Sequence, residues 1–375
     1  MPDARRDVIV VGAGIVGCAC AAEIARSGRS VILAEAVDVA SDTSCRAMGH
    51  VGVYDDNSAQ IVLTRYARRL WEEIAPELPP EVEFVRRGAL WVAPTEEEMA
   101  EVEAKERVYR DARVEARVVD ARTLHEMEPN LNPDLPGALF VPGDIVVDAT
   151  ESTRFLARRA QSFGAEIRVG TRVRTVAPDG VVLEDGSEWR AETVVVAAGW
   201  QVAKLLPQVP VRPRKGHIAL TEPRPGFVRH QVSEVGYVRG ADAANPEVIT
   251  FSFQPRTSGR YLIGATRQYV GESAEVEPRI IEALLTRARR FLPDVDRLKI
   301  ERTWTGFRPA GPDAVPLIGP LPGQPGTILA AAHEGIGITT ALATGHLVAD
   351  LVAGSPTEIP VEPYLPSRLS PPRAV

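Results

Sequence analysis

The sequence predicts an α/β protein in which a doubly wound, mainly parallel sheet carries an inserted α+β domain built on an antiparallel sheet. Three observations predict this class. A strand–helix–strand pattern with a glycine-rich turn opens the chain, short alternating runs split by Pro and Gly fill the middle, and the strand-to-helix pattern returns near the end. Because 375 residues exceed the usual size of one core, two domains are expected.

The first unit is easiest to predict. Asp7 to Val11 is an apolar run that breaks at Gly12, as a buried parallel strand would. Small and apolar residues from Ile15 to Ser27 predict a helix, and Ser30 to Ala34 predicts a second strand that closes on Glu35. These elements form one complete βαβ unit.

Later elements follow from the same periodicities. Residues 40–54 are polar and contain glycine, which predicts a loop leading into a helix or short strand. Helices are predicted over residues 57–76, 96–117, 150–164 and 335–352. Buried strands are predicted at residues 166–169, 181–183, 193–200 and 327–332, and antiparallel strands at residues 217–220, 248–253 and 261–265.

The return of the first pattern makes the nucleotide-binding domain discontinuous. We expect it to contain residues 1–80, 147–211 and 308–365. The inserted, substrate-binding domain is expected to contain residues 81–146 and 212–307, and residues 366–375 form a tail.

Composition excludes several classes of protein. A formal net charge of −7, spread over both halves, argues against a nucleic-acid partner. No apolar run is long enough to span a bilayer, and neither a metal-ligand set nor an iron–sulfur cysteine set is present. Cys18 and Cys20 stand two apart on a predicted helix and point different ways, which disfavours a disulfide. We expect a cytoplasmic, reduced protein that can form an oligomer.

Gly12, Gly14 and Gly17 form a G-x-G-x-x-G pattern directly between a strand and a helix, which is typical of a Rossmann-like dinucleotide site. The glycines permit a tight turn, close approach of a pyrophosphate and close packing of helix on strand, while amides at the helix start meet the negative charge. Glu35, at the end of the second strand, is suited to a pair of ribose hydroxyls. The alternative is an exposed carboxylate at a strand end.

This pattern does not separate NAD from FAD, but longer segments do. VIVVGAGIVG, SDTSCRAMGH, VVVAAGW, RPRKGH, YLIGAT, WTGFRPAGPDAVPLIGP and AAHEGIGITTALATGHLVADL, in this order, resemble the D-amino acid oxidase superfamily of flavoproteins over nearly the whole chain. The glycine oxidase and D-hydroxyproline (D-proline) dehydrogenase group is most similar. The resemblance implies FAD as the cofactor.

The resemblance also implies the residues around FAD. The histidine and late cysteine that attach FAD covalently in some relatives are missing, with Arg46 in the position of the histidine, so noncovalent FAD is expected. Val173 can instead be a core residue, and His333 a packed core histidine. The implied FAD-binding residues are Gly12, Gly14, Ile15, Val16, Gly17, Glu35, Ala36, Thr43, Ser44, Ala47, Met48, Gly49, Val173, Ala198, Gly199, Trp200, Arg308, His333, Glu334, Gly335, Ile336, Gly337, Ile338 and Thr339.

Arg308 matches the family arginine that pairs with a substrate carboxylate, a task that suits a planar guanidinium. A salt bridge is the alternative. Ser252 falls where glycine oxidases carry a tyrosine, and Gly335 where they carry a second arginine, so the pocket differs from theirs. Arg267 matches a position that lines the substrate pocket, although the sequence alone favours a surface arginine.

The resemblance implies oxidation of an amine or amino acid bearing a carboxylate to its imine, by hydride transfer to flavin N5. D-amino acids, D-proline or D-hydroxyproline, and glycine-like compounds are the candidate substrates, and O2, a quinone or a partner protein is the candidate electron acceptor. Two alternatives stay open. One is the oxidation of a 2-hydroxy acid, and the other is a flavin-binding subunit of a larger dehydrogenase complex.

Overall fold

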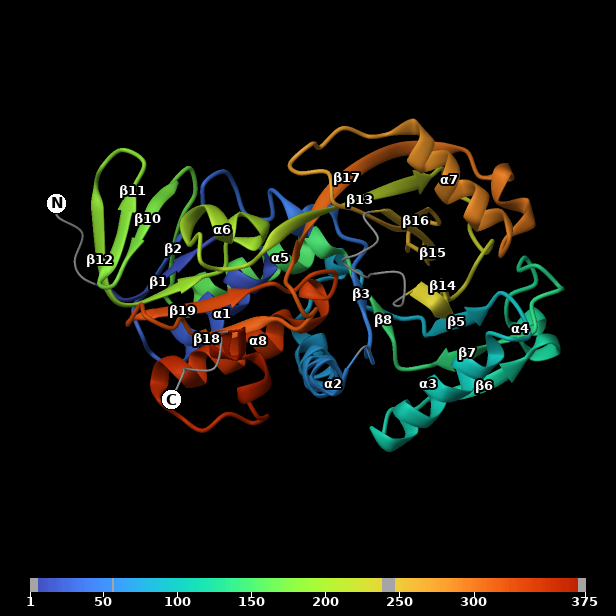
Figure 1. The fold of residues 1–375 in the computed structure, drawn as a ribbon, viewed down its shortest axis with the longest axis horizontal. Coiled ribbons are helices and arrows are strands. Elements are labelled where there is room, and N and C mark those ends of the chain that lie inside the picture. The colour runs from blue at the N-terminus through green and yellow to red at the C-terminus, as the bar shows by residue number, and fades with distance from the viewer. Residues whose placement is uncertain (1–5, 56, 238–246, 370–375) are drawn as a thin grey trace.

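The structure is a computed structural model that describes residues 6–55, 57–237 and 247–369. Two eight-stranded sheets and one three-stranded sheet organise these residues. The sheet that contains β1 is called the first sheet, and the sheet that contains β13 is called the second sheet. In Figure 1 the first sheet occupies the left half of the molecule and the second sheet the right half.

The first sheet has a parallel core in which β1, β2, β12 and β19 contribute buried runs of aliphatic residues, as is typical of parallel strands. Its order is β10-β11-β12-β1-β2-β9, and β12 also pairs with β19, which pairs with β18. Strands predicted around residues 7–11, 30–34, 166–169, 193–200 and 327–332 all lie in this sheet. The parallel strands are β1 (Arg6–Val11), β2 (Val31–Ala34), β9 (Glu166–Arg168), β12 (Glu188–Val196) and β19 (Thr327–Ala331), and the antiparallel ones are β10 (Val173–Ala177), β11 (Gly180–Leu183) and β18 (Leu317–Pro320).

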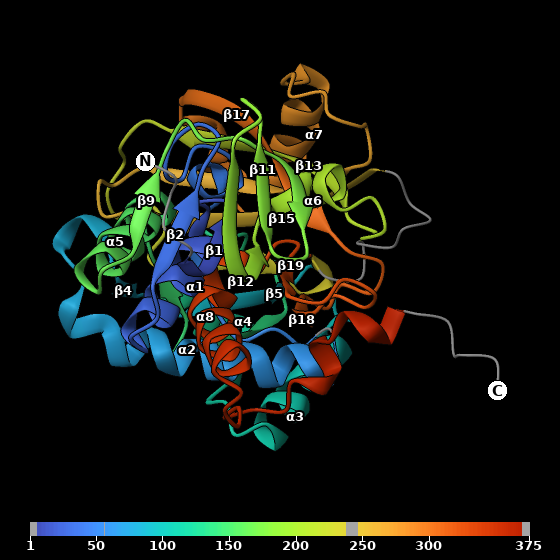
Figure 2. The ribbon, with the colours of Figure 1, turned by 90° about the vertical axis from the view of Figure 1, so that its left-hand side faces the viewer.

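Small residues pack the helices of this half closely. A Cβ atom on Gly345 would lie 2.7 Å from the carbonyl oxygen of Ala19, so α8 approaches α1 to backbone contact. Helices α1, α8 and α2 lie one below another in Figure 2, on the side away from α7. The helices of this half are α1 (Ile15–Arg26), α2 (Ser58–Ile74), α5 (Ala149–Ser162), α6 (Val202–Leu205) and α8 (Gly337–Ala353).

The second sheet is antiparallel except where β14 pairs with β5 in parallel. Its order is β17-β13-β16-β15-β14-β5-β7-β6. Phe251 and Phe291 stack with ring centroids 4.7 Å apart and join α7 and its following turn to the sheet. The elements are β5 (Ala89–Ala93), β6 (Arg117–Asp120), β7 (Gly137–Val141), β13 (Arg212–Thr221), β14 (Gln231–Glu234), β15 (Glu247–Pro255), β16 (Tyr261–Gln268), β17 (Ile300–Ala310), α3 (Met99–Asp111), α4 (Ala121–Met127) and α7 (Pro278–Arg289).

A small sheet, β3-β8-β4, lies at the junction of the two halves. It consists of β3 (His50–Val51), β8 (Ile145–Val146) and β4 (Val85–Arg86). The described 3₁₀ helices are η1 (Thr43–Arg46), η2 (Ala75–Glu77), η3 (Pro80–Val82), η4 (Gly199–Gln201), η5 (Val235–Tyr237), η7 (Pro293–Arg297), η8 (Glu362–Tyr364) and η9 (Pro366–Leu369). Within the described ranges, no helix combines the length and apolar character needed to cross a membrane.

The predicted fold class is confirmed, but some boundaries differ. The helix predicted over residues 96–117 ends at Asp111, because Arg113 adopts a left-handed backbone (φ +55°) and Val114 donates its amide to Tyr109 O. No glycine marks this end, so the sequence carried no signal for it. The domain boundary predicted at residue 308 falls inside β17, and the domain division itself stays a prediction.

Candidate active site

One cavity of about 710 Å³ is lined by elements of both large sheets. Most residues predicted for the site line it, although they come from distant parts of the chain. Those residues are Gly12, Gly14, Ile15, Val16, Glu35, Ala36, Thr43, Ser44, Ala47, Met48, Gly49, Val173, Ala198, Gly199, Trp200, Ser252, Arg308, His333, Glu334, Gly335, Gly337 and Ile338. Gly17, Arg267, Ile336 and Thr339 do not line it.

The glycine-rich turn connects β1 to α1 at one side of the cavity. Gly12 has a left-handed backbone (φ +102°), and a Cβ atom there would lie 2.7 Å from the carbonyl oxygen of Ala197 at the end of β12. A Cβ atom on Gly17 would lie 1.9 Å from Gly12 O. Both positions therefore require glycine for packing, and Gly17 packs against Gly12 without lining the cavity.

The start of α1 is open to an anion. Gly14 at its N-cap supplies no side-chain cap, and the first turn has no acidic residue. The Ile15 amide meets Ser44 Oγ at 3.0 Å, which brings the hydroxyl of the 43–49 loop to the helix end. Because the helix dipole and the remaining amides at this end attract negative charge, the site suits a phosphate group.

Glu35 is held in place by the backbone. Its carboxylate oxygens accept the amides of Ala13 and Val37, both at 2.8 Å. Thr171 donates its amide to the backbone carbonyl of Glu35 at 2.7 Å, so the segment leading to Val173 lies beside the end of β2. A fixed acceptor at the end of β2, next to the open start of α1, is the arrangement expected for a dinucleotide's ribose.

The 43–49 loop is tied to β17. Thr43 Oγ1 donates to Phe307 O at 2.7 Å, and Trp304 Nε1 donates to Arg46 O at 3.2 Å. Gly49 has φ +86°, and a Cβ atom there would lie 2.0 Å from Val147 O. The loop therefore has little freedom to leave the cavity wall.

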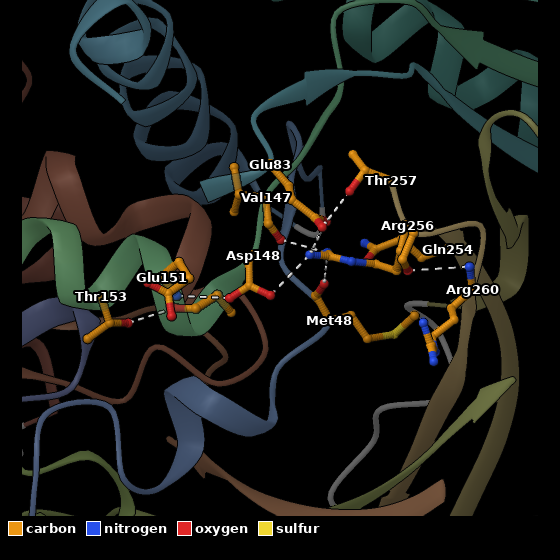
Figure 3. Close-up of polar contacts among 12 residues, drawn as sticks. Met48, Glu83, Val147, Asp148, Glu151, Thr153, Gln254, Arg256, Thr257 and Arg260 are labelled. Atoms are coloured by element: carbon orange, nitrogen blue, oxygen red, sulfur yellow. Dashed lines mark hydrogen bonds and ion pairs between the residues drawn. The ribbon is translucent and has the colours of Figure 1, made fainter. Parts of the chain in front are cut away.

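Arg256, which follows β15, fixes the same loop from the other side (Figure 3). Its Nη1 donates to Val147 O at 2.9 Å and reaches Met48 O at 3.5 Å. Its Nη2 pairs with Asp148 at 3.2 Å and with Glu83 at 2.6 Å. One guanidinium thus joins the second sheet to the backbone that carries Met48.

Arg308 reaches across the floor of the cavity. Its guanidinium passes over Gly216 on the neighbouring strand β13, where a Cβ atom would lie 2.5 Å from Nη1. Nη1 donates to Thr266 O on β16 at 2.9 Å, which fixes the plane of the fork. A Cβ atom on Gly335 would lie 3.6 Å from Arg308 Nε, an ordinary contact distance. The turn before α8 therefore also lies next to Arg308.

Glu334 is the counter-charge beside Arg308. Its Oε1 lies 3.5 Å from Arg214 Nη1 and 4.0 Å from Arg267 Nε. Burial acts to raise the pKa of Glu334, but Arg267, Arg308 and Arg214 outweigh it, so the pKa is lowered and the carboxylate stays charged. Arg267 is therefore a buried neighbour of Glu334, outside the cavity wall, and its direct contact with a substrate stays a prediction.

The start of α8 forms another wall. Its N-cap supplies no side-chain cap, and its first turn has no acidic residue. His333, just before it, is buried with Nε2 3.0 Å from Thr344 Oγ1, and burial lowers the pKa of His333 to about 3. The imidazole is therefore neutral at ordinary pH. Thr339 is not part of the cavity wall and donates to His50 O at 2.9 Å.

Sequence reasoning missed several residues that line the cavity. His50, Tyr54 and Trp91 line it, and His50 links Asp144 Oδ2 (3.0 Å from Nε2) to the Tyr54 hydroxyl (3.1 Å from Nδ1). Gln231 and Ser233 line it beside Ser252. Their spacing in the chain carries no motif, so only strand pairing could reveal them.

Comparisons with known proteins agree with this geometry. The profile of the family described as FAD dependent oxidoreductase (DAO) matches residues 7–351. Glycine oxidase from Geobacillus kaustophilus is 30% identical, with 96% of each chain aligned. A crystal structure of that enzyme has a TM-score of 0.88 at 29% identity and covers 97% of this chain and 98% of its own.

Two other solved structures are also similar. Iminodiacetate oxidase from Chelativorans sp. BNC1 has a TM-score of 0.83 at 26% identity and covers 96% of this chain and 98% of its own. L-proline dehydrogenase from P. horikoshii has a TM-score of 0.88 at 23% identity and covers 98% of both chains, a likeness of fold.

Proposed function

The chain belongs to the DAO family of FAD-dependent oxidoreductases, and from this premise we propose that it oxidises a small amine or amino acid that bears a carboxylate. The candidate substrates are D-amino acids, D-proline-like imino acids and glycine-like compounds. The observation that carries this proposal is the position of Arg308, whose guanidinium is fixed over Gly216 inside the cavity.

The residues present fit FAD. The open start of α1 and the turn at Gly12 would hold the pyrophosphate, Glu35 would hold ribose hydroxyls, and the 43–49 loop and the start of α8 would hold the ring. When bound, FAD supplies the two-electron acceptor for the reaction. We propose that it is held without a covalent bond, since Arg46 occupies the position of the attaching histidine.

Arg308 would hold the carboxylate of the substrate. A guanidinium offers a planar pair of donors that matches a carboxylate, and its charge is fixed at every ordinary pH. Because Nη1 is already bonded to Thr266 O, the side chain is oriented before a substrate enters. Such preorganisation places the carbon that carries the amine at a defined point of the cavity.

His333 and Glu334, in the turn before α8, are not needed for proton transfer. The lowered pKa of His333, about 3, and the lowered pKa of Glu334 mean that neither group changes its protonation near neutral pH. We therefore propose that the amine reacts in its neutral form. The partial positive charge at the start of α8, by contrast, does not depend on pH. It would stabilise negative charge that develops nearby.

Anaerobic mixing of the FAD-loaded protein with candidate compounds tests the proposal. Bleaching of the flavin absorbance is expected with carboxylated amines. Arg308→Ala should raise the concentration needed for half-maximal reduction by about thirtyfold or more, because a bidentate charged contact is lost. Arg302→Ala, on the solvent-facing part of the same strand, is the matched control.

Other outcomes identify other functions. Reduction by 2-hydroxy acids and not by amines would replace the proposal with hydroxy-acid oxidation. FAD binding without reduction by any compound would identify a subunit that needs partner chains. Repeating the successful reaction in air and with a quinone then decides which electron acceptor is used.

A further inference from the structure

Three polar side chains form a connected group where β14 and β15 of the second sheet line the cavity. Ser252 on β15 stands opposite Ser233 on β14, and their hydroxyl oxygens are 3.0 Å apart. Gln231, two residues before Ser233 and on the same face, donates from Nε2 to Ser252 Oγ at 2.7 Å and meets Ser233 Oγ at 3.3 Å. We call these three residues the distal polar group.

The group is buried, yet one of its atoms lacks a partner. Gln231, Ser233 and Ser252 are only 2%, 4% and 5% exposed, and all three line the cavity. Gln231 Oε1 has no hydrogen-bond partner among the residues that the structure describes. A buried acceptor without a donor is unfavourable, so a cavity that holds one is suited to a ligand that donates to it.

The hydroxyl protons of Ser233 and Ser252 also bear on which ligand group fits the cavity. The two amide protons of Gln231 are directed to the serines, and a single proton suffices for the contact between the two hydroxyls. One serine hydroxyl therefore keeps a proton to donate, while Gln231 Oε1 accepts. A ligand group that is both donor and acceptor, such as a hydroxyl or a carboxamide, complements both.

The distance from Arg308 fits a small amino acid. The arginine's Nη1 is bonded to Thr266 O on β16, and Ser252 on β15 stands opposite Gly264, two residues from Thr266. With about 4.8 Å between strands and about 3.3 Å per residue, the backbone positions of Thr266 and Ser252 are roughly 8 Å apart. The guanidinium bonded to Thr266 O and the side chain of Ser252 are therefore near enough for the two ends of one small amino acid to meet both.

The wall between the two points is apolar. Gly216 and Ile218 line the cavity there, and Met48, which also lines it, covers Gly264, where a Cβ atom would lie 2.9 Å from Met48 Sδ. Carbon atoms of a substrate would therefore lie over an apolar floor, with polar contacts at both ends only.

We infer that the substrate is an α-amino acid whose side chain ends in a hydroxyl or carboxamide group, which the distal polar group recognises. This inference rests on the proposed function, because it takes Arg308 as the site of the carboxylate. Gln231, Ser233 and Ser252 are then residues that determine specificity, and Gln231 discriminates most because its orphaned oxygen gains a donor only from the correct substrate.

Binding to the FAD-loaded protein tests the inference without turnover. Two pairs of carboxylates that lack the amine have matched shapes: 3-hydroxybutyrate against 3-methylbutyrate, and succinamate against 4-methylpentanoate. Each is titrated in both enantiomers where they exist, and the change in the flavin absorbance reports binding. We expect at least one hydrogen-bonding member to bind at least about tenfold more tightly than its apolar partner.

Variants assign that preference to the distal polar group. Gln231→Met and Ser252→Ala should reduce the preference to about twofold or less and leave the affinity of the apolar member nearly unchanged. Ser152→Ala, a buried serine of α5 outside the cavity, is the matched control and should keep the preference. Equal affinities within both pairs in the unaltered protein, or a preference that survives in Gln231→Met and Ser252→Ala, would overturn the inference.

Flavin reduction separates this inference from the proposed function. Threonine is compared with valine, and asparagine with leucine, in both enantiomers under nitrogen. If the carboxylates show the preference and no amine reduces the flavin, the proposed function is wrong, whereas recognition of a polar ligand group by the distal polar group is supported. If amines reduce the flavin without any preference for a polar side chain, the proposed function stands and the inference is wrong.

Discussion

The guanidinium of Arg308 lies over the α-carbon of Gly216, so close that a methyl group at residue 216 would fall 2.5 Å from Nη1. The backbone there is ordinary strand, so glycine is required by the arginine and not by the backbone. Two strands, β13 and β17, are therefore matched to each other at the point where we place the substrate carboxylate.

Gly216→Ala should displace Arg308 without removing its charge. We expect the half-saturating concentration of a carboxylated substrate to rise by about tenfold to a hundredfold, because the fork loses its fixed plane. Anaerobic flavin reduction measures this. Gly236→Ala introduces the same methyl group where no atom of the described residues lies within 4 Å and serves as the control. Unchanged substrate affinity in Gly216→Ala would remove Arg308 from the carboxylate site.

Glu35→Gln should weaken FAD binding. The carboxylate accepts two backbone amides, and a neutral amide can accept at only one of its two ends, so both the loop and the proposed ribose contact are impaired. We expect the dissociation constant of FAD to rise by about tenfold or more. Titration of the protein freed of FAD, followed by flavin fluorescence, measures it, and Glu184→Gln, an exposed carboxylate beside Arg172, is the control.

Arg256→Met should destabilise the protein strongly. The arginine pairs with Glu83 and Asp148 and donates to Val147 O, as Figure 3 shows, and its loss leaves two carboxylates near one another without their cation. We expect the free energy of unfolding to fall by about 3 to 5 kcal/mol. Denaturant unfolding of the FAD-loaded protein measures this change.

Arg260→Met provides the contrast to Arg256→Met. Arg260 forms a largely exposed pair with Glu301, for which about 0 to 1 kcal/mol is expected. Similar losses in the two variants would show that Arg256 is no more than a surface contact. An altered flavin absorbance in Arg256→Met alone would confirm that the arginine positions the loop at Met48.

His333 should make folding sensitive to acid. Burial lowers the pKa of His333 to about 3, whereas an unfolded histidine titrates near about 6.5. Between these values the unfolded chain binds a proton that the folded chain does not, so stability is complete above about pH 6.5 and falls as pH decreases. The loss approaches about 1.4 kcal/mol per pH unit for this single group.

The variant His333→Gln isolates that effect. The slope of unfolding free energy against pH between about 6.5 and 4 should become shallower by nearly one proton, as denaturant unfolding at several pH values would show. His125→Gln, on the exposed face of α4, should leave the slope as it is. An equal slope in His333→Gln and the unaltered protein would mean that His333 is protonated in the folded state.

The nucleotide half of the site could be predicted because its signals are local. Gly12, Gly14 and Glu35 lie within one βαβ unit, whose strand and helix periods and turn glycines are readable along the chain. Arg308 was identified by its resemblance to the family, but its reach across β13 to Thr266 depends on pairing between β17, β13 and β16, segments far apart in the chain.

The sequence by itself determined the fold class and the dinucleotide turn, because backbone geometry at glycines and the alternation of apolar residues act over a few positions at a time, and the resemblance of longer segments to a flavoprotein family determined the choice of FAD. Only the tertiary structure decided that Arg267 meets Glu334 outside the cavity wall and that Gln231 and Ser233 join Ser252 in that wall. Those relationships arise from strand register, and a register shift of one residue would turn each of these side chains to the opposite face.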